Sequence, residues 1–140
     1  MKEQEITLTQ LDHMRLSSLL NMQENIPHHL HEEELEELQV EIDRARIKDS
    51  DEIPCDLITM NSHFTYLDVT HGKAGEMTIV YPKFSNTLDH KISVLAPLGI
   101  AMLGLREGEE IDWKFPDGQV RKLRILKILF QPEANGDLNI

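Results

Sequence analysis

Residues 92–118, ISVLAPLGIAMLGLREGEEIDWKFPDG, contain a short apolar strand, a helix start and the first strand of a hairpin. Pro97 suits the first position of a helix, and the apolar run Gly99–Leu105 predicts a short buried helix that ends near Gly108. Apolar side chains then alternate along Glu110–Phe115, which is typical of a half-buried strand. This stretch therefore combines strand and helix signals.

Further strand patterns lie on both sides of this stretch. The turn Pro116-Asp117-Gly118 leads into Val120–Phe130, the longest predicted strand, so the last two strands are expected to form a hairpin. Upstream, three short segments predict strands, with a turn at residues 70–75 before the third: Leu57–Met60, Phe64–Val69 and Met77–Tyr81. Together these patterns predict an α+β fold with a mostly antiparallel β-sheet and one short helix.

Composition changes before Pro54. All seven glycines and all seven aromatic residues lie in residues 54–140, whereas residues 1–53 carry −9 of the net charge of −11. We therefore predict two domains, a helical appendage at residues 1–53 and a β-rich domain at residues 54–140, joined at Ser50–Pro54.

The N-terminal piece predicts two helices. Thr9 followed by Asp12 resembles a capping box at the start of the first helix. The segment Asn25-Ile26-Pro27 interrupts the pattern, because proline disfavours a helical residue before it. The second helix has apolar residues at a 3-4-3 spacing, the seam of a coiled coil: Leu35, Leu38, Ile42 and Ala45. We expect an antiparallel helical hairpin, each helix being about 15–20 residues long.

Several classes of protein are excluded by composition. The chain has 140 residues, and no apolar run approaches the roughly 18–20 residues that span a bilayer. The polar N-terminus does not resemble a signal peptide. The single cysteine, Cys55, excludes an internal disulfide, has no nucleophile signature and is expected to be partly buried. We expect a cytoplasmic protein without a membrane partner, and the negative charge argues against direct DNA binding.

Patterns that resemble catalytic or metal sites are incomplete. His31-Glu32-Glu33-Glu34-Leu35 begins like a zinc motif, but leucine stands where the second histidine is needed. His28, His29 and His31 with Glu32 could form a weak metal site, although a solvated helix start is the simpler interpretation. Gly99–Gly104 has the spacing of a phosphate-binding loop without its Lys-Ser/Thr. No motif specifies an enzyme or a cofactor, so the residues favour a noncatalytic interaction protein.

Basic side chains occupy both faces of the last predicted strand: Arg121, Lys122, Arg124 and Lys127. They could form a patch for an acidic partner. The alternative is a solvated strand, because the four bases are interleaved with apolar residues.

A longer pattern in the C-terminal piece is shared with a known family. It consists of Ile92-Ser93-Val94-Leu95-Ala96-Pro97, Leu103-x-Leu105-x-x-Gly108 and Ile111-x-Trp113-x-x-Pro116-x-Gly118. In order and spacing it resembles the C-terminal domain of the bacterial Gre transcript-cleavage factors, which has an FKBP-like fold. The regulator of nucleoside diphosphate kinase (Rnk) family, homologous to Gre factors, is a closer match over residues 41–137, through segments such as Val80-Tyr81-Pro82 and Gln131-Pro132-Glu133-Ala134.

The resemblance implies a partner and two candidate sites. It implies a regulator that binds RNA polymerase at the rim of the secondary channel, competes with Gre factors there and affects nucleoside diphosphate kinase levels indirectly. We expect a monomer, because a self-contained helical hairpin needs no second chain. By matching position, the polymerase-docking candidates are Leu95, Ala96, Pro97 and Leu98, although Pro97 also fits a plain helix start. The acidic run Glu32–Glu37 is expected either to line the channel or only to keep the hairpin soluble.

The expected tip of the hairpin is poor in acids. The tip candidates are Glu24, Asn25 and Pro27, and a single carboxylate is a weak substitute for the acidic residues with which Gre factors help to hold magnesium. We therefore expect no transcript cleavage. The alternative is a cleavage-stimulating factor that uses tip acids with magnesium. A proline isomerase, which only the FKBP-like fold implies, is disfavoured because few aromatic residues are present.

Overall fold

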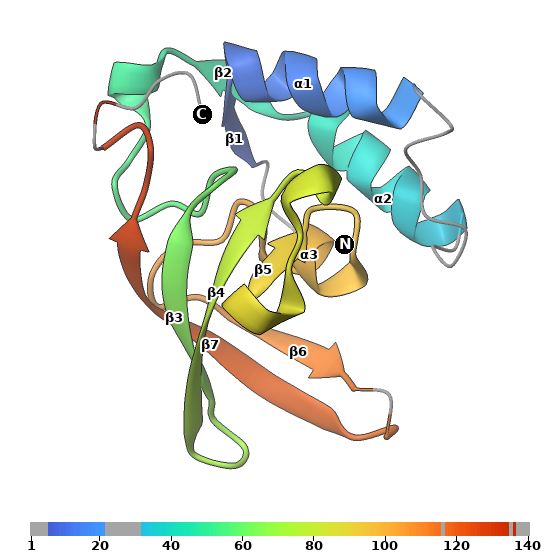
Figure 1. Ribbon diagram of the computed structural model, residues 1–140, viewed down its shortest axis with the longest axis vertical. Coiled ribbons are helices and arrows are strands. Elements are labelled where there is room, and N and C mark those ends of the chain that lie inside the picture. The colour runs from blue at the N-terminus through green and yellow to red at the C-terminus, as the bar shows by residue number, and fades with distance from the viewer. Residues whose placement is uncertain (1–5, 22–31, 116, 135, 137–140) are drawn as a thin grey trace.

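The architecture is α+β: a curled five-stranded sheet with two helices packed across one end, seen in Figure 1 in a computed structural model. The structure describes residues 6–21, 32–115, 117–134 and 136. Within these residues, no helix is long and apolar enough to cross a membrane.

The five-stranded sheet has the order β5-β4-β3-β7-β6. Its strands are β3 (His63–Asp68), β4 (Lys73–Val80), β5 (Lys91–Ser93), β6 (Glu110–Lys114) and β7 (Val120–Phe130). All neighbours are antiparallel except β4 and β5, which are parallel. The pairing of β3 with β7 shifts register twice, and such irregularities increase twist and bend the strands. The mostly antiparallel sheet is therefore confirmed; an FKBP-like arrangement stays a prediction.

Both hairpins form where the turn signals place them. The β3–β4 turn contains Gly72 at φ +69°, and the β6–β7 turn contains Gly118 at φ +85°. A left-handed backbone of this kind favours glycine, because glycine has no Cβ to clash. Strand β4 begins earlier than the sequence indicates, because Lys73–Gly75 continue the ladder opposite Tyr66–Asp68.

The expected strand at Leu57–Met60 is wrong. Leu57 makes only an isolated bridge with Arg106, and the segment ends in a turn. The side-chain amide of Gln131 donates instead to the carbonyl oxygens of Pro54 and Leu57, each at 2.7 Å. Within the segment, the N–H of Ile58 donates to Leu105, and its carbonyl oxygen accepts from Gly104. All four residues are buried, so the segment fills the core without the alternation that defines a half-exposed strand.

Two twelve-residue helices, α1 (Gln10–Asn21) and α2 (Glu32–Asp43), form the N-terminal piece. The expected lengths of 15–20 residues and the expected tip both involve residues outside the described ranges. The hydroxyl of Thr9 accepts the N–H of Asp12 at 3.1 Å, which confirms the predicted start of α1. The helices contact one another, but a coiled coil stays a prediction, because Leu38 and Ile42 pack into the core shared with the sheet.

A parallel strand pair closes the N-terminal piece and was not predicted. Strand β1 (Thr7–Thr9) leads into α1, and β2 (Arg46–Lys48) follows α2, with Thr7 paired to Arg46 and Thr9 to Lys48. The segment that contains both helices is therefore a crossover between neighbouring parallel strands, as Figure 1 shows at the upper end of the molecule.

One hydrophobic core joins the two parts of the chain. From the N-terminal piece it includes Ile6, Leu8, Leu16, Leu38 and Ile42, and from the C-terminal piece Ile58, Met60, Phe64, Met77, Ile79, Val94, Leu95, Ile100, Met102, Leu103, Leu105, Leu123 and Ile125. The division into domains at residues 53 and 54 stays a prediction. Cys55, which we expected to be partly buried, is exposed.

The short helix α3 (Pro97–Met102) confirms the expected position of Pro97 at a helix start. It ends earlier than expected, because Gly104 adopts φ +87° and its N–H donates to Ile58 instead of continuing the helix.

Candidate partner-binding surfaces

The docking candidates lie in a tight turn between β5 and α3. The side-chain hydroxyl of Ser93 accepts a hydrogen bond from the N–H of Leu95 at 3.0 Å. The backbone carbonyl oxygen of Ser93 accepts one from the N–H of Ala96, also at 3.0 Å. Leu95 is fully buried, whereas Ala96, Pro97 and Leu98 are half-buried. Leu95 therefore anchors the turn in the core, and the other three supply its accessible surface. Their role in docking stays a prediction.

Gly99 holds this turn close to the strand before it. A Cβ atom at Gly99 would overlap the backbone carbonyl oxygen of Ser93. A backbone oxygen cannot move aside as the end of a flexible side chain can. The approach of α3 to β5 thus depends on glycine at this position.

The other candidate site, the hairpin tip at Glu24, Asn25 and Pro27, lies outside the described residues. On the described part of α2, Glu36 and Asp43 are exposed, whereas Glu41 is buried. Two exposed carboxylates thus lie on α2, and a channel-lining role for the acidic run stays a prediction.

A buried polar cluster connects α1 to the C-terminal piece, and sequence analysis missed it. The hydroxyl of Tyr81 donates to Oδ1 of Asp12 at 3.2 Å, and the hydroxyl of Thr59 donates to Oε2 of Glu133 at 3.3 Å. Burial, followed by the charge of Glu133, raises the pKa of Asp12 to about 7. Burial also raises the pKa of Glu133, and burial with the neighbouring Asp12 raises that of Tyr81. The contact between α1 and the C-terminal piece therefore contains carboxyl groups, those of Asp12 and Glu133, whose pKa values are raised.

A groove of about 1110 Å³ runs beside this cluster, between α1 and one end of the sheet. One wall is the face of α1 that carries Met14, Arg15, Ser18 and Leu19. The rest of the lining comes from the strand ends and the turn Pro82–Phe84: Asn61, His63, Thr78, Val80, Tyr81, Pro82, Lys83, Phe84, Lys91 and Phe130. These segments are far apart in the sequence, which is why no local pattern indicated the groove.

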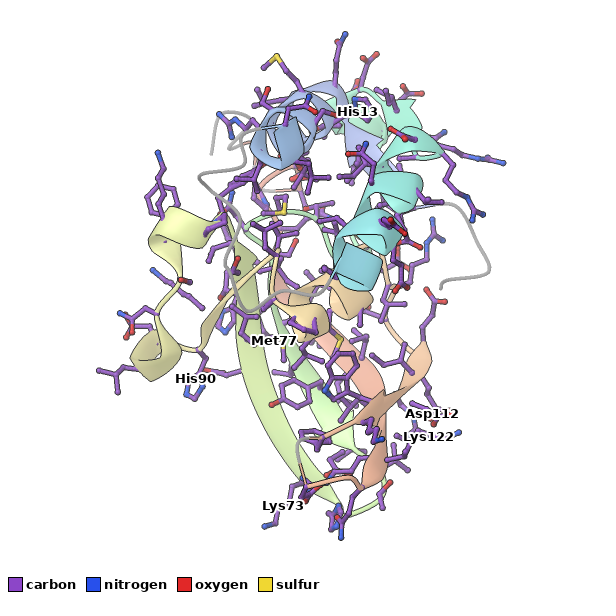
Figure 2. The ribbon with its side chains drawn as sticks, turned by 90° about the vertical axis from the view of Figure 1, so that its right-hand side faces the viewer. His13, Lys73, Met77, His90, Asp112 and Lys122 are labelled. Carbon is purple, nitrogen blue, oxygen red and sulfur yellow. The ribbon has the colours of Figure 1, made fainter. Side chains whose placement is uncertain are left out.

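Most of the basic residues of β7 form ion pairs with acidic residues of the same molecule. Arg124 pairs with Glu110 at 2.7 Å, and Lys122 with Asp112 at 3.9 Å, a pair labelled in Figure 2. Arg121 pairs with Asp117 and lies over the ring of Phe115 at 4.3 Å from its centre. Cross-strand pairs of this kind support the sheet, so the geometry favours a solvated strand over a patch for an acidic partner.

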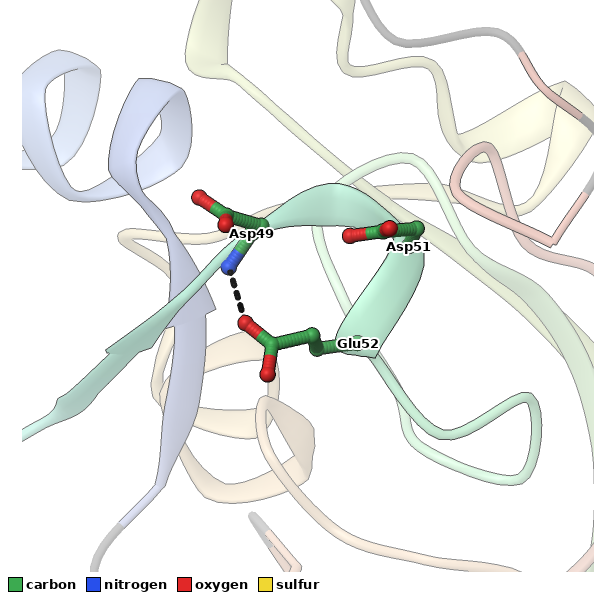
Figure 3. Close-up of side chains that lie close together, drawn as sticks. All are labelled: Asp49, Asp51 and Glu52. Carbon is green, nitrogen blue, oxygen red and sulfur yellow. Dashed lines mark hydrogen bonds between the residues drawn. The ribbon is translucent and has the colours of Figure 1, made fainter.

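Three exposed carboxylates, Asp49, Asp51 and Glu52, are close enough together to share a cation (Figure 3). The N–H of Asp49 donates to Oε1 of Glu52 at 3.3 Å. This bond closes the short 3₁₀ turn Ser50–Glu52, which accounts for the cluster as a local cap.

Comparison with known proteins adds the family context. The family model described as "Transcription elongation factor, GreA/GreB, C-term" matches residues 53–130, and the one described as "Rnk N-terminus" matches residues 4–47. The regulator of nucleoside diphosphate kinase of Escherichia coli K12 is 40% identical over 100 residues, covering 71% of this chain and 74% of that protein. The transcription elongation factor GreA of Alkaliphilus oremlandii is 32% identical over 97 residues, covering 69% and 60%.

A solved structure agrees with the fold. The prokaryotic transcription elongation factor GreA/GreB from Nitrosomonas europaea superposes with a TM-score of 0.78 at 36% identity, covering 91% of this chain and 100% of the other. The likeness therefore extends over both the helices and the sheet.

Proposed function

The chain belongs to the regulator of nucleoside diphosphate kinase (Rnk) family and is related to the Gre elongation factors, and from this relation we propose that it binds RNA polymerase as a noncatalytic, cytoplasmic regulator of transcription. It docks at the rim of the secondary channel and competes there with Gre factors. Its effect on nucleoside diphosphate kinase is indirect, through transcription. The observation that carries the proposal is the match of residues 53–130 to the C-terminal domain of GreA and GreB.

The accessible part of the 95–98 turn supports a docking role. Ala96, Pro97 and Leu98 lie at the start of α3, on a turn that Leu95 and Gly99 hold rigidly against the core. A preorganised turn loses little conformational entropy when a partner binds it.

A competition assay tests the proposal. Labelled Gre factor is bound to core RNA polymerase, and this protein is added as a monomer at micromolar concentrations. We expect it to displace the Gre factor, and the variant Ala96→Glu to weaken displacement at least about tenfold. Leu88→Glu is the matched control, because Leu88 is exposed in the short 3₁₀ turn Thr87–Asp89 and is not part of the 95–98 turn. Failure of the unmodified protein to displace the Gre factor contradicts the proposal.

Backtracked transcription complexes separate this function from transcript cleavage. We expect no increase in RNA cleavage when the protein and magnesium are added. Cleavage that is lost in a Glu24→Ala variant would identify a cleavage factor instead.

A further inference from the structure

The groove between α1 and the sheet is a second surface, distinct from the 95–98 turn. Its walls carry apolar side chains that the protein leaves open to solvent: Met14 on α1 is 58% exposed, and Phe84 on the opposite wall is 55% exposed. Between them lie the half-buried side chains of Leu19, Tyr81 and Phe130. Clusters of exposed apolar side chains rimmed by polar groups occur at interaction sites.

The charge of the groove is opposite to that of the chain as a whole. None of the described residues that line it is acidic, although acids outnumber bases 25 to 14 in the sequence. Arg15, Lys83 and Lys91 line it, and Lys83 lies 5.0 Å above the ring of Phe84. Two described acids contact lining residues: Asp12 accepts from Tyr81, and Glu76 lies 3.7 Å from His63.

The volume of the groove suits one element of secondary structure. An α-helix about 10 Å across rises about 15 Å in ten residues, so two to three turns occupy on the order of 1000 Å³. The groove is similar in volume, at about 1110 Å³. An apolar face on such a helix would meet Met14 and Phe84, and flanking carboxylates would meet Lys83 and Lys91.

We propose that this groove binds an acidic amphipathic helix of a partner protein. The inference goes beyond polymerase docking at the 95–98 turn, because it concerns other residues and is tested without polymerase. The cations attract the helix and orient it, whereas the aromatic and aliphatic walls bury its apolar face.

Binding is measured with the full chain and a fluorescein-labelled peptide of about 14 residues, with leucine at every third or fourth position and glutamate elsewhere. We expect fluorescence anisotropy to give a dissociation constant of about 10–100 µM, as for a small transient interface. Affinity should fall as the salt concentration rises, because the rim charges are exposed. A peptide with lysine in place of glutamate and an acidic peptide with serine in place of leucine should both bind at least about tenfold more weakly.

Two variants identify the groove as the binding surface. The double variant Lys83→Glu with Lys91→Glu, and separately Phe84→Ser, should each weaken the glutamate peptide at least about tenfold. Lys73→Glu is the matched control for charge, because Lys73 is exposed at the opposite end of the sheet from α1 (Figure 2). It should leave the affinity unchanged. Circular dichroism verifies that each variant is folded.

Other outcomes overturn the proposal. Equal affinity for the glutamate and lysine peptides would show that the basic residues of the groove do not select an acidic partner. If the double variant keeps its affinity within about twofold, the peptide binds to another surface. If the peptide with serine in place of leucine binds as tightly as the glutamate-leucine peptide, the interaction is purely electrostatic and the apolar walls do not contribute. Tighter binding of a labelled single-stranded RNA, lost in the same double variant, would make the groove a nucleic-acid site. None of these peptide measurements affects the competition assay with RNA polymerase, which tests the proposed function separately.

Discussion

At the scale of single residues, Asp12 joins the two parts of the molecule through a buried carboxyl group with a raised pKa. Its carboxyl group is buried, accepts from Tyr81 and lies near Glu133. A charge in this position is costly, because burial removes water from it. The ordinary pKa of an aspartate is 3.8, whereas that of Asp12 in the folded protein is about 7. Between these two values the folded protein therefore holds a proton that the unfolded chain releases.

The raised pKa of Asp12 predicts that the stability of the protein depends on pH. Because the folded pKa is raised, the free energy of unfolding should fall as pH rises from about 4 to 7 and then level off. The raised pKa of Glu133 acts in the same direction. Asp12→Asn keeps an oxygen acceptor for Tyr81 and should increase stability at pH 8 by about 2 kcal/mol, with little gain at pH 4.

Denaturant unfolding at pH 4, 6 and 8 measures the effect. Asp43→Asn is the control, because Asp43 is exposed at the end of α2, where its carboxylate accepts from the side-chain amide of Gln39. Parallel stability curves for the unmodified protein and Asp12→Asn would contradict the electrostatic interpretation.

Gly99 gives a second residue-scale prediction. In a helix, glycine to alanine usually gains stability, but here the new Cβ would overlap the carbonyl oxygen of Ser93. We expect Gly99→Ala to lower the free energy of unfolding by about 1–3 kcal/mol. Ala101→Gly in the same helix should cost about 1 kcal/mol through helix propensity alone. A more stable Gly99→Ala protein would mean that α3 does not approach β5 so closely.

At the scale of elements, the starts of two helices were easier to predict than some strands. Thr9 before α1 and Pro97 at α3 are local signals, because the cap bond and the fixed φ of proline involve only near neighbours. The expected strand at Leu57–Met60 is wrong, and the polar backbone groups of the segment bond to distant residues: the Leu57 carbonyl to Gln131, more than seventy residues away, and Ile58 to Gly104 and Leu105. The parallel pairing of β1 with β2 also depends on distant segments.

The cap of α1 predicts a measurable contribution. Thr9→Ala removes the hydroxyl that accepts the N–H of Asp12 and should lower the free energy of unfolding by about 1 kcal/mol. Thr9→Ser keeps the hydroxyl and loses only the methyl group. The difference between the two variants in thermal unfolding therefore isolates the cap, and equal losses would exclude a role for the hydroxyl.

At the scale of the whole molecule, the composition distinguished a helical part from a β-rich part, but it did not show how closely they pack. Leu16 and Ile42 belong to the same buried cluster as Phe64 and Ile125. The groove also escaped prediction, because α1, β4 and the end of β7 form it together. The docking turn was identified from the family pattern, whereas the burial of Leu95 needed the structure.

A shared core predicts cooperative unfolding. Leu16→Ala should lower the free energy of unfolding by about 2–4 kcal/mol, because it leaves a cavity between helix and sheet. The helices are followed by far-ultraviolet circular dichroism and the sheet by the fluorescence of Trp113, the single tryptophan, on β6. Both transitions should shift together. Met14→Ala, on the exposed face of α1, is the control, and separate transitions would support two independent domains.

The parallel pairing of β1 with β2 has a consequence for descent and engineering. Because the two strands hold both ends of the helical crossover side by side, the crossover can be lengthened between the core residues of α1 and those of α2 without moving its ends. Insertions of whole helical turns, made equally in α1 and α2, leave the entry and exit points where they are. Lengthening at that point changes how far the helices reach and leaves the core that they share with the sheet intact.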